Sequence, residues 1–126
     1  MAARIAEHRA RRGGEWQTVE APRDIAVALA AVPAGAAALV DCLTLWLTNV
    51  MLVGADVDAE IARLERALEG RTGPVVLVAN EVGLGIVPEN ALARRFRDAA
   101  GRLNQAMAAR ADRVVLMVAG IPVQVK

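Results

Sequence analysis

The chain has 126 residues, 56% of them hydrophobic and 2% aromatic, which is enough for a single domain with an aliphatic core. With 15 basic and 14 acidic side chains the net charge is +1, so no charge excess favours binding to nucleic acid or to a membrane surface. The single Cys42 excludes an internal disulfide, and the sequence has neither a membrane-span-sized apolar run nor a signal-peptide pattern, so we expect a cytoplasmic protein.

The N-terminal third is predicted to form two helices with a short strand between them. Residues Met1–Arg12 are rich in alanine and arginine and favour a helix that a Gly-Gly pair ends. Residues Trp16–Glu20 alternate large apolar with polar side chains, which indicates a strand. A second helix is expected over Ile25–Val32, where a proline stops it.

Three apolar runs predict strands buried on both faces, as in a parallel sheet. These runs are Ala37–Asp41, Val75–Ala79 and Arg113–Ala119. The helices expected between them are Leu43–Val53, Asp56–Glu69 and Asn90–Arg110. In the last helix, the core-facing positions are predicted to be Leu92, Phe96, Leu103 and Met107. Strands that alternate with helices predict an α/β fold with helices on both faces of the sheet. Residues Gly120–Lys126 are expected to turn, with a short edge strand as one outcome.

Polar side chains end the first two of these strands, at the edge where open α/β sheets bind ligands. Asp41 follows an apolar run in the pattern of a Walker B strand, whose carboxylate holds a magnesium ion or its water. Asn80 and Glu81 precede a glycine-rich loop, and nucleotide, magnesium or substrate are all candidate ligands for them. The alternative is an ordinary strand–loop–helix connection. Cys42 is interpreted as a small core residue.

The first helix carries the only histidine, His8, followed by Arg9, Arg11 and Arg12. Arginines can hold a triphosphate, and a neutral imidazole beside phosphates is a competent nucleophile for phosphorus. The alternatives are a surface histidine and a solvated arginine face.

Two segments carry a resemblance to a known family. These are RIAEHRARRGGEWQTVE, and NEVGLGIVPEN followed by ALARRFRDAAGRLNQ. They resemble the bifunctional adenosylcobinamide kinase / adenosylcobinamide-phosphate guanylyltransferase family of cobalamin biosynthesis, over essentially the whole chain. The resemblance implies one nucleotide-binding domain over residues 1–126, with an α/β fold of the P-loop NTPase (RecA-like) type, and a homo-oligomer. It also implies a reaction in two steps. ATP or GTP phosphorylates adenosylcobinamide, and GTP then passes GMP through a histidine to adenosylcobinamide phosphate.

The resemblance also implies roles for individual residues. His8 would become covalently linked to GMP, and Asp41 would hold Mg²⁺ or orient the nucleotide phosphates. The nucleotide-binding residues that it implies are Arg9, Ala10, Arg11, Arg12, Glu20 and Asp41. Asn80 and Glu81 are expected to contact substrate or magnesium.

One motif of the family is absent from these residues. No G-x-x-x-x-G-K-[ST] phosphate loop occurs, and the only lysine is Lys126. We therefore expect a sheet without its first strand, weak GTP binding, and a Met1 that is a downstream start or an artificial boundary. An alternative function is an inactive remnant that keeps only subunit contacts or weak nucleotide binding. An unrelated nucleotide-binding regulatory domain is a third hypothesis.

Overall fold

The structure, a computed structural model, describes residues 2–126, without the side chains at positions 2, 4, 5, 8 and 9. Its helices are α1 (Ala2–Arg12), α2 (Ile25–Ala31), α3 (Leu43–Leu52), α4 (Val57–Glu69) and α5 (Ala91–Arg110). Its strands are β1 (Ala38–Asp41), β2 (Val75–Val78), β3 (Val115–Val118) and β4 (Ile121–Gln124). Each predicted helix is confirmed. Within the described part of the chain, no helix combines the length and the apolar character needed to cross a bilayer.

The strand predicted over Trp16–Glu20 is wrong. This segment is irregular and exposed, with Trp16 and Val19 open to solvent. Alternation of apolar and polar side chains supports a strand only where a neighbouring strand takes up its backbone N–H and C=O groups. The described strands pair only with one another, so no strand lies beside this segment to form a ladder with it.

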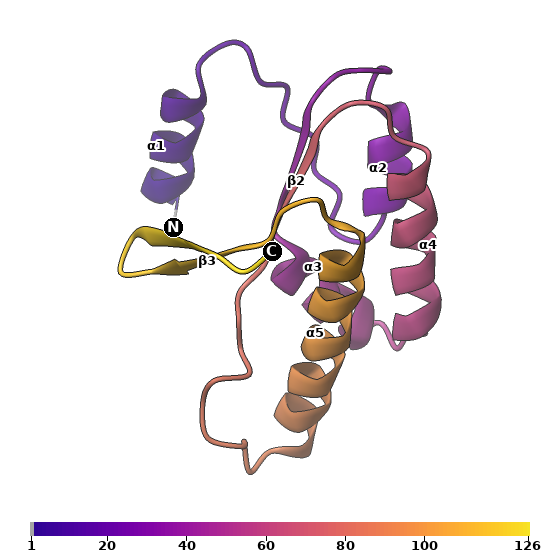
Figure 1. The fold of residues 1–126 in the computed structure, drawn as a ribbon, viewed down its shortest axis with the longest axis vertical. Helices are drawn as coiled ribbons and strands as arrows, with labels where there is room; N and C mark the ends of the chain where they lie inside the picture. The colour runs from indigo at the N-terminus through magenta and orange to yellow at the C-terminus, as the bar shows by residue number, and fades with distance from the viewer. Residues whose placement is uncertain (1) are drawn as a thin grey trace.

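Strands β1 and β2 form a parallel pair at the centre of the molecule (Figure 1). Their register runs from Ala38 opposite Val75 to Asp41 opposite Val78. The two strands therefore end level with each other, and the polar residues that follow them emerge at the same edge. The predicted parallel arrangement is confirmed for these two strands.

The prediction that the strands are buried on both faces is wrong. Side chains alternate along β2, so that Val75 and Leu77 pack against the core while Val76 is 57% exposed. Helices thus cover only one face of the pair. Strand β3 does not join this sheet, because it pairs antiparallel with β4, and every residue of that hairpin is exposed. The short final strand is confirmed.

The core lies between the helices and the covered face of the β1–β2 pair. Its most completely buried side chains are Leu43, Leu47, Leu64, Leu103 and Val50, from α3, α4 and α5. The prediction that Leu92 faces the core is wrong, because this residue is 53% exposed. It lies in the first turn of α5, before Phe96 and the later residues of the helix that pack against the core.

The packed faces of α4 and α5 are joined by ion pairs at their C-terminal ends. Arg110 Nε donates to Glu65 Oε1 at 2.8 Å, and Arg110 Nη1 donates to Glu69 Oε1. The hydrogen bond to Glu65, and to a smaller extent that to Glu69, raises the pKa of Arg110 above its ordinary value. The groups are solvent-accessible, so the pairs fix the relative position of the helices more than they stabilise the fold.

The connections that lead into β1 and β2 are packed on each other. Arg71, just before β2, donates from Nη1 to Val32 O at 2.9 Å and from Nη2 to Ala36 O at 2.5 Å. Thr72 Oγ1 accepts from Gly35 N at 3.1 Å. One guanidinium thus satisfies carbonyls at the end of α2 and at the start of β1. Because these bonds join the entry points of both strands, they set the register of the parallel pair.

Gly73 lies where these two connections come closest, and its replacement tests the junction. An added Cβ would overlap the Ala36 carbonyl oxygen and come within 2.7 Å of Gly35 C. We expect Gly73→Ala to lower the free energy of unfolding by about 1–3 kcal/mol, because backbone would have to move. The control is Gly101→Ala in α5, where a Cβ meets nothing within 4 Å and helix propensity should add up to about 1 kcal/mol. Urea unfolding of both variants checks this, and equal effects would contradict it.

Candidate functional site

The carboxyl end of β1 brings together two of the predicted site residues. Arg12, the last residue of α1, has its Nη2 3.9 Å from Asp41 Oδ2, with side chains 36% and 49% exposed. An exposed pair at this distance contributes little to stability. Both groups therefore remain available to ligands, a cationic donor beside an acidic acceptor at the end of a parallel strand.

The other predicted residues of α1 are placed less completely. The side chains of His8 and Arg9 lie outside the described residues, but His8 occupies a helical position about one turn before Arg12. Arg11 donates from Nη2 to Glu7 Oε1 at 2.9 Å and is exposed. Ala10 is exposed as well. Helix α1 stands apart from the other helices (Figure 1), so its C-terminal turn is the part that meets the strand end.

The predicted pair Asn80 and Glu81 follows β2 and starts the loop to α5. The backbone N–H of Asn80 donates to Thr44 Oγ1 at 2.7 Å, and Glu81 Oε1 accepts from Gly83 N at 2.6 Å. The first turn of α3 is therefore fixed to the end of β2. Both side chains are exposed, at the edge where Asp41 also emerges.

Glu20 lies in the exposed segment between α1 and α2. Two side chains of α3 hold the end of that segment. Trp46 Nε1 donates to Arg23 O at 2.7 Å, and Asn49 Nδ2 donates to Pro22 O at 2.9 Å. The sequence analysis missed these anchors, because a tryptophan within an apolar helix gives no signal beyond burial.

The residues present suit one mode of magnesium binding. Among the side chains that the structure describes, no group of three or more His, Cys, Asp or Glu residues gathers as a metal cage. Magnesium, however, commonly keeps several waters and is held by one or two carboxylates together with substrate phosphates. Half-exposed Asp41 at a strand end fits this second mode.

The only lysine of the chain is committed elsewhere. Lys126 Nζ donates to Ala108 O at 3.0 Å and to Ala109 O at 3.2 Å. It therefore caps the C-terminal end of α5, where a cation also interacts favourably with the helix dipole. It does not supply a phosphate-binding ammonium at the strand edge.

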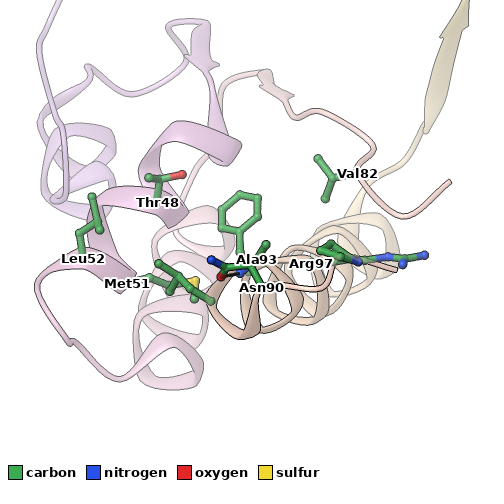
Figure 2. Close-up of a pocket in the computed structure, with 10 residues that line it drawn as sticks. Thr48, Met51, Leu52, Val82, Asn90, Ala93 and Arg97 are labelled. Carbon is green, nitrogen blue, oxygen red and sulfur yellow. Dashed lines mark hydrogen bonds between the residues drawn. The ribbon is translucent and has the colours of Figure 1, made fainter. Parts of the chain in front are cut away.

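A second feature, missed by the sequence analysis, is an apolar groove of about 570 Å³ between α3 and α5. Figure 2 shows Thr48, Met51 and Leu52 on its α3 side, with Val82 from the loop and the first turns of α5 opposite. Leu92 and Phe96 complete the α5 wall. We call this hollow the α3–α5 groove. The exposed Leu92 that did not fit the core belongs to it.

A comparison with known families decides which family this is. A profile described as cobinamide kinase / cobinamide phosphate guanyltransferase matches residues 1–125. The chain belongs to this family. The bifunctional adenosylcobalamin biosynthesis protein CobP of Pseudomonas aeruginosa is 48% identical and aligns with the whole chain, which covers 75% of that relative. The CobU proteins of Salmonella typhimurium and Escherichia coli are 43% and 42% identical, each with 78% of its length covered.

Membership of the cobinamide kinase / guanyltransferase family confirms the resemblance found in the sequence. It also confirms the reaction class, a kinase and nucleotidyltransferase of cobalamin biosynthesis. The guanyltransferase activity of the family implies GTP as a substrate.

The link between α3 and the end of β2 can be tested with a matched pair of variants. Thr44→Val removes the acceptor of the Asn80 N–H, and we expect a loss of about 0.5–1.5 kcal/mol in unfolding free energy. Exchange of the Asn80 amide hydrogen should become faster. Thr48→Val is the control, because the Thr48 hydroxyl donates to Thr44 O within its own helix. Equal Asn80 exchange rates in the two variants would contradict the link.

Proposed function

We propose that the carboxyl end of the β1–β2 pair is where GTP reacts and that His8 carries GMP to adenosylcobinamide phosphate. The observation that carries this proposal is the approach of Arg12 to Asp41, at 3.9 Å. It brings the end of the histidine-bearing helix to the edge of a parallel sheet, where such folds bind ligands. Family membership supplies the reaction class.

The proposed transfer has two balanced steps. A nitrogen of His8 attacks the α-phosphorus of GTP, so an N–P bond forms while the bond to the bridging oxygen breaks and pyrophosphate leaves with the electron pair. A phosphate oxygen of adenosylcobinamide phosphate then attacks the same phosphorus. The P–N bond breaks, its electrons return to the imidazole, and the product is adenosyl-GDP-cobinamide.

The other groups act by binding and charge. Arg12 is placed to donate to phosphate oxygens, and a guanidinium that meets developing negative charge stabilises a phosphoryl transition state. Asp41 would hold Mg²⁺, which, when bound, neutralises phosphate charge. We propose that the nucleotide is contacted by Arg9, Ala10, Arg11 and Glu20. The side chains of Asn80 and Glu81 are proposed to contact either the arm of the corrinoid or the magnesium ion and its waters.

We also propose that residues 1–126 form one cytoplasmic domain of the P-loop NTPase type. In support, apolar side chains of β2, β3 and β4 are exposed, and β2 and β3 belong to separate sheets. Sheet faces of this kind favour association, so a homo-oligomer is proposed. We propose that the kinase step, with ATP or GTP, takes place at the same edge of the sheet.

A second candidate function is an inactive chain that keeps subunit contacts or weak nucleotide binding. The observation that favours it is the position of Lys126 on the end of α5, away from the edge of the sheet at which phosphates are proposed to bind. Labelling of the chain by GTP distinguishes the two candidates.

The histidine role predicts a covalent label. With millimolar magnesium and GTP labelled at the α-phosphate, the chain should acquire an acid-labile, base-stable label, as a phosphoramidate requires. His8→Asn should remove it. Arg12→Ala should slow labelling by about ten- to a hundredfold, because a charge-assisted hydrogen bond contributes about 1.5–3 kcal/mol.

Arg66→Ala is the matched control, because it removes an exposed arginine from α4, far along the chain from the proposed site. It should leave the labelling rate unchanged. A label that persists in His8→Asn would remove His8 from the mechanism, and a chain that never labels would favour the inactive candidate.

Nucleotide affinity gives a separate prediction. Phosphate loops hold nucleotides through backbone amides and a lysine, and these residues contain no such loop. The loss of several charge-assisted hydrogen bonds lowers affinity by roughly a thousandfold or more. We therefore expect isothermal titration with magnesium-GTP to show weak binding and no phosphorylation of adenosylcobinamide. Micromolar binding at one site per chain would show that Arg12, Asp41 and their neighbours suffice.

A further inference from the structure

Helix α3 links the α3–α5 groove to the proposed reaction site. The helix begins at Leu43, and its cap, Cys42, is the one residue between it and the end of β1. Its Thr44 hydroxyl accepts from the Asn80 N–H, and Thr48, one turn later, lines the groove. Leu43 and Leu52 are the first and last of the ten residues of α3, and nine steps of 1.5 Å separate them by about 13 Å along the helix axis. A ligand in the groove can therefore reach toward the strand ends while its bulk stays about a helix length away.

The groove has few free hydrogen-bond donors or positive charges that could bind a phosphate. Its Arg97 donates from Nη2 to Gly83 O at 2.5 Å, and neighbouring Arg94 donates from Nη1 to Pro88 O at 2.9 Å. Asn90 Oδ1 already accepts from the Ala93 N–H as the cap of α5. The charged groups of these walls are thus used to hold the loop and the helix start. The open surface is predominantly aliphatic and aromatic, which suits a large and weakly charged ligand.

Apolar surface also extends beyond the groove itself. The loop between β2 and α5 contributes Val82 to the wall and then carries Leu84 and Ile86, both highly exposed. Exposed apolar patches that continue a concave site commonly mark where a ligand is bound. A flat ring system larger than the groove would meet apolar contacts both inside and along the loop.

We infer that the α3–α5 groove binds the corrin ring of the acceptor substrate, with its aminopropanol arm directed toward Asp41 and Asn80. This inference rests on the proposed function for the class of ligand, because the two reactions share one large macrocyclic acceptor. The groove seats an edge of the macrocycle, and the strand ends receive the hydroxyl or phosphate that reacts. Nucleotide and corrinoid thus approach the same edge of the sheet from different sides.

Binding of adenosylcobinamide to the 126-residue chain tests the inference without any nucleotide. Equilibrium dialysis, read from the visible absorbance of the corrin ring, measures the affinity directly. Leu52→Glu and Leu92→Glu place a charge on opposite walls, and each should weaken binding by at least about tenfold. Both side chains are exposed, so both variants should still fold. In Leu92→Glu, the new carboxylate lies in the first turn of α5, where it interacts favourably with the helix dipole.

Val53→Glu is the matched control, because Val53 is 55% exposed beside Leu52 but does not line the groove. Val27→Glu in α2 is a more distant one. Both should bind adenosylcobinamide within about twofold of the parent chain. Circular dichroism should show the same helix content in all four variants.

The outcomes separate this inference from the histidine mechanism. Labelling by GTP without corrinoid should be the same in the parent chain and in Leu52→Glu. If labelling fails while the binding pattern holds, the role of His8 is lost and the groove assignment stands. The inference is overturned if the parent chain does not retain adenosylcobinamide, or if Val53→Glu weakens binding as much as Leu52→Glu.

Discussion

The contact between the two strand-entry connections is the constraint on which the rest of the structure depends. Arg71 spans the end of α2 and the start of β1, and Gly73 allows the two backbones to approach more closely than any side chain would permit. These contacts hold Ala38 opposite Val75, and the parallel ladder carries that register to Asp41. Without it, Asp41 and the residues after β2 would not emerge at one edge.

Helix α3 connects this edge of the sheet to the α3–α5 groove. Its first turn is fixed to the end of β2 through Thr44, and its indole and amide side chains hold the segment that precedes α2. Its C-terminal half forms one wall of the α3–α5 groove. The proposed phosphate chemistry and the proposed apolar binding therefore lie at the two ends of one helix, so a change in packing along α3 would affect both.

The sequence predicted local structure well because each helix has its own signals. Asp56 and Asn90 cap α4 and α5 as their side chains suggest, and Asp41 is the last residue of β1, at the strand end where the sequence placed it. Burial was predicted less well, because an apolar run does not reveal how many neighbours its strand has. Leu92 shows the same limit, since helical periodicity cannot distinguish a core contact from the wall of a groove. The proximity of Arg12 to Asp41 joins residues distant in sequence, and no local pattern encodes it.

The exposed strand faces and the groove have different physical meanings. On β2, β3 and β4 the apolar side chains belong to extended backbone, so the surface that covers them must also satisfy backbone N–H and C=O groups at the strand edges. Another strand meets both demands. The walls of the groove are mainly helices whose backbone is already hydrogen-bonded, and the guanidinium of Arg97 is occupied by a loop carbonyl. A ligand of that surface needs only apolar contact and a complementary shape, and it does not need to pair with backbone groups. A macrocycle meets these conditions better than a β-strand does.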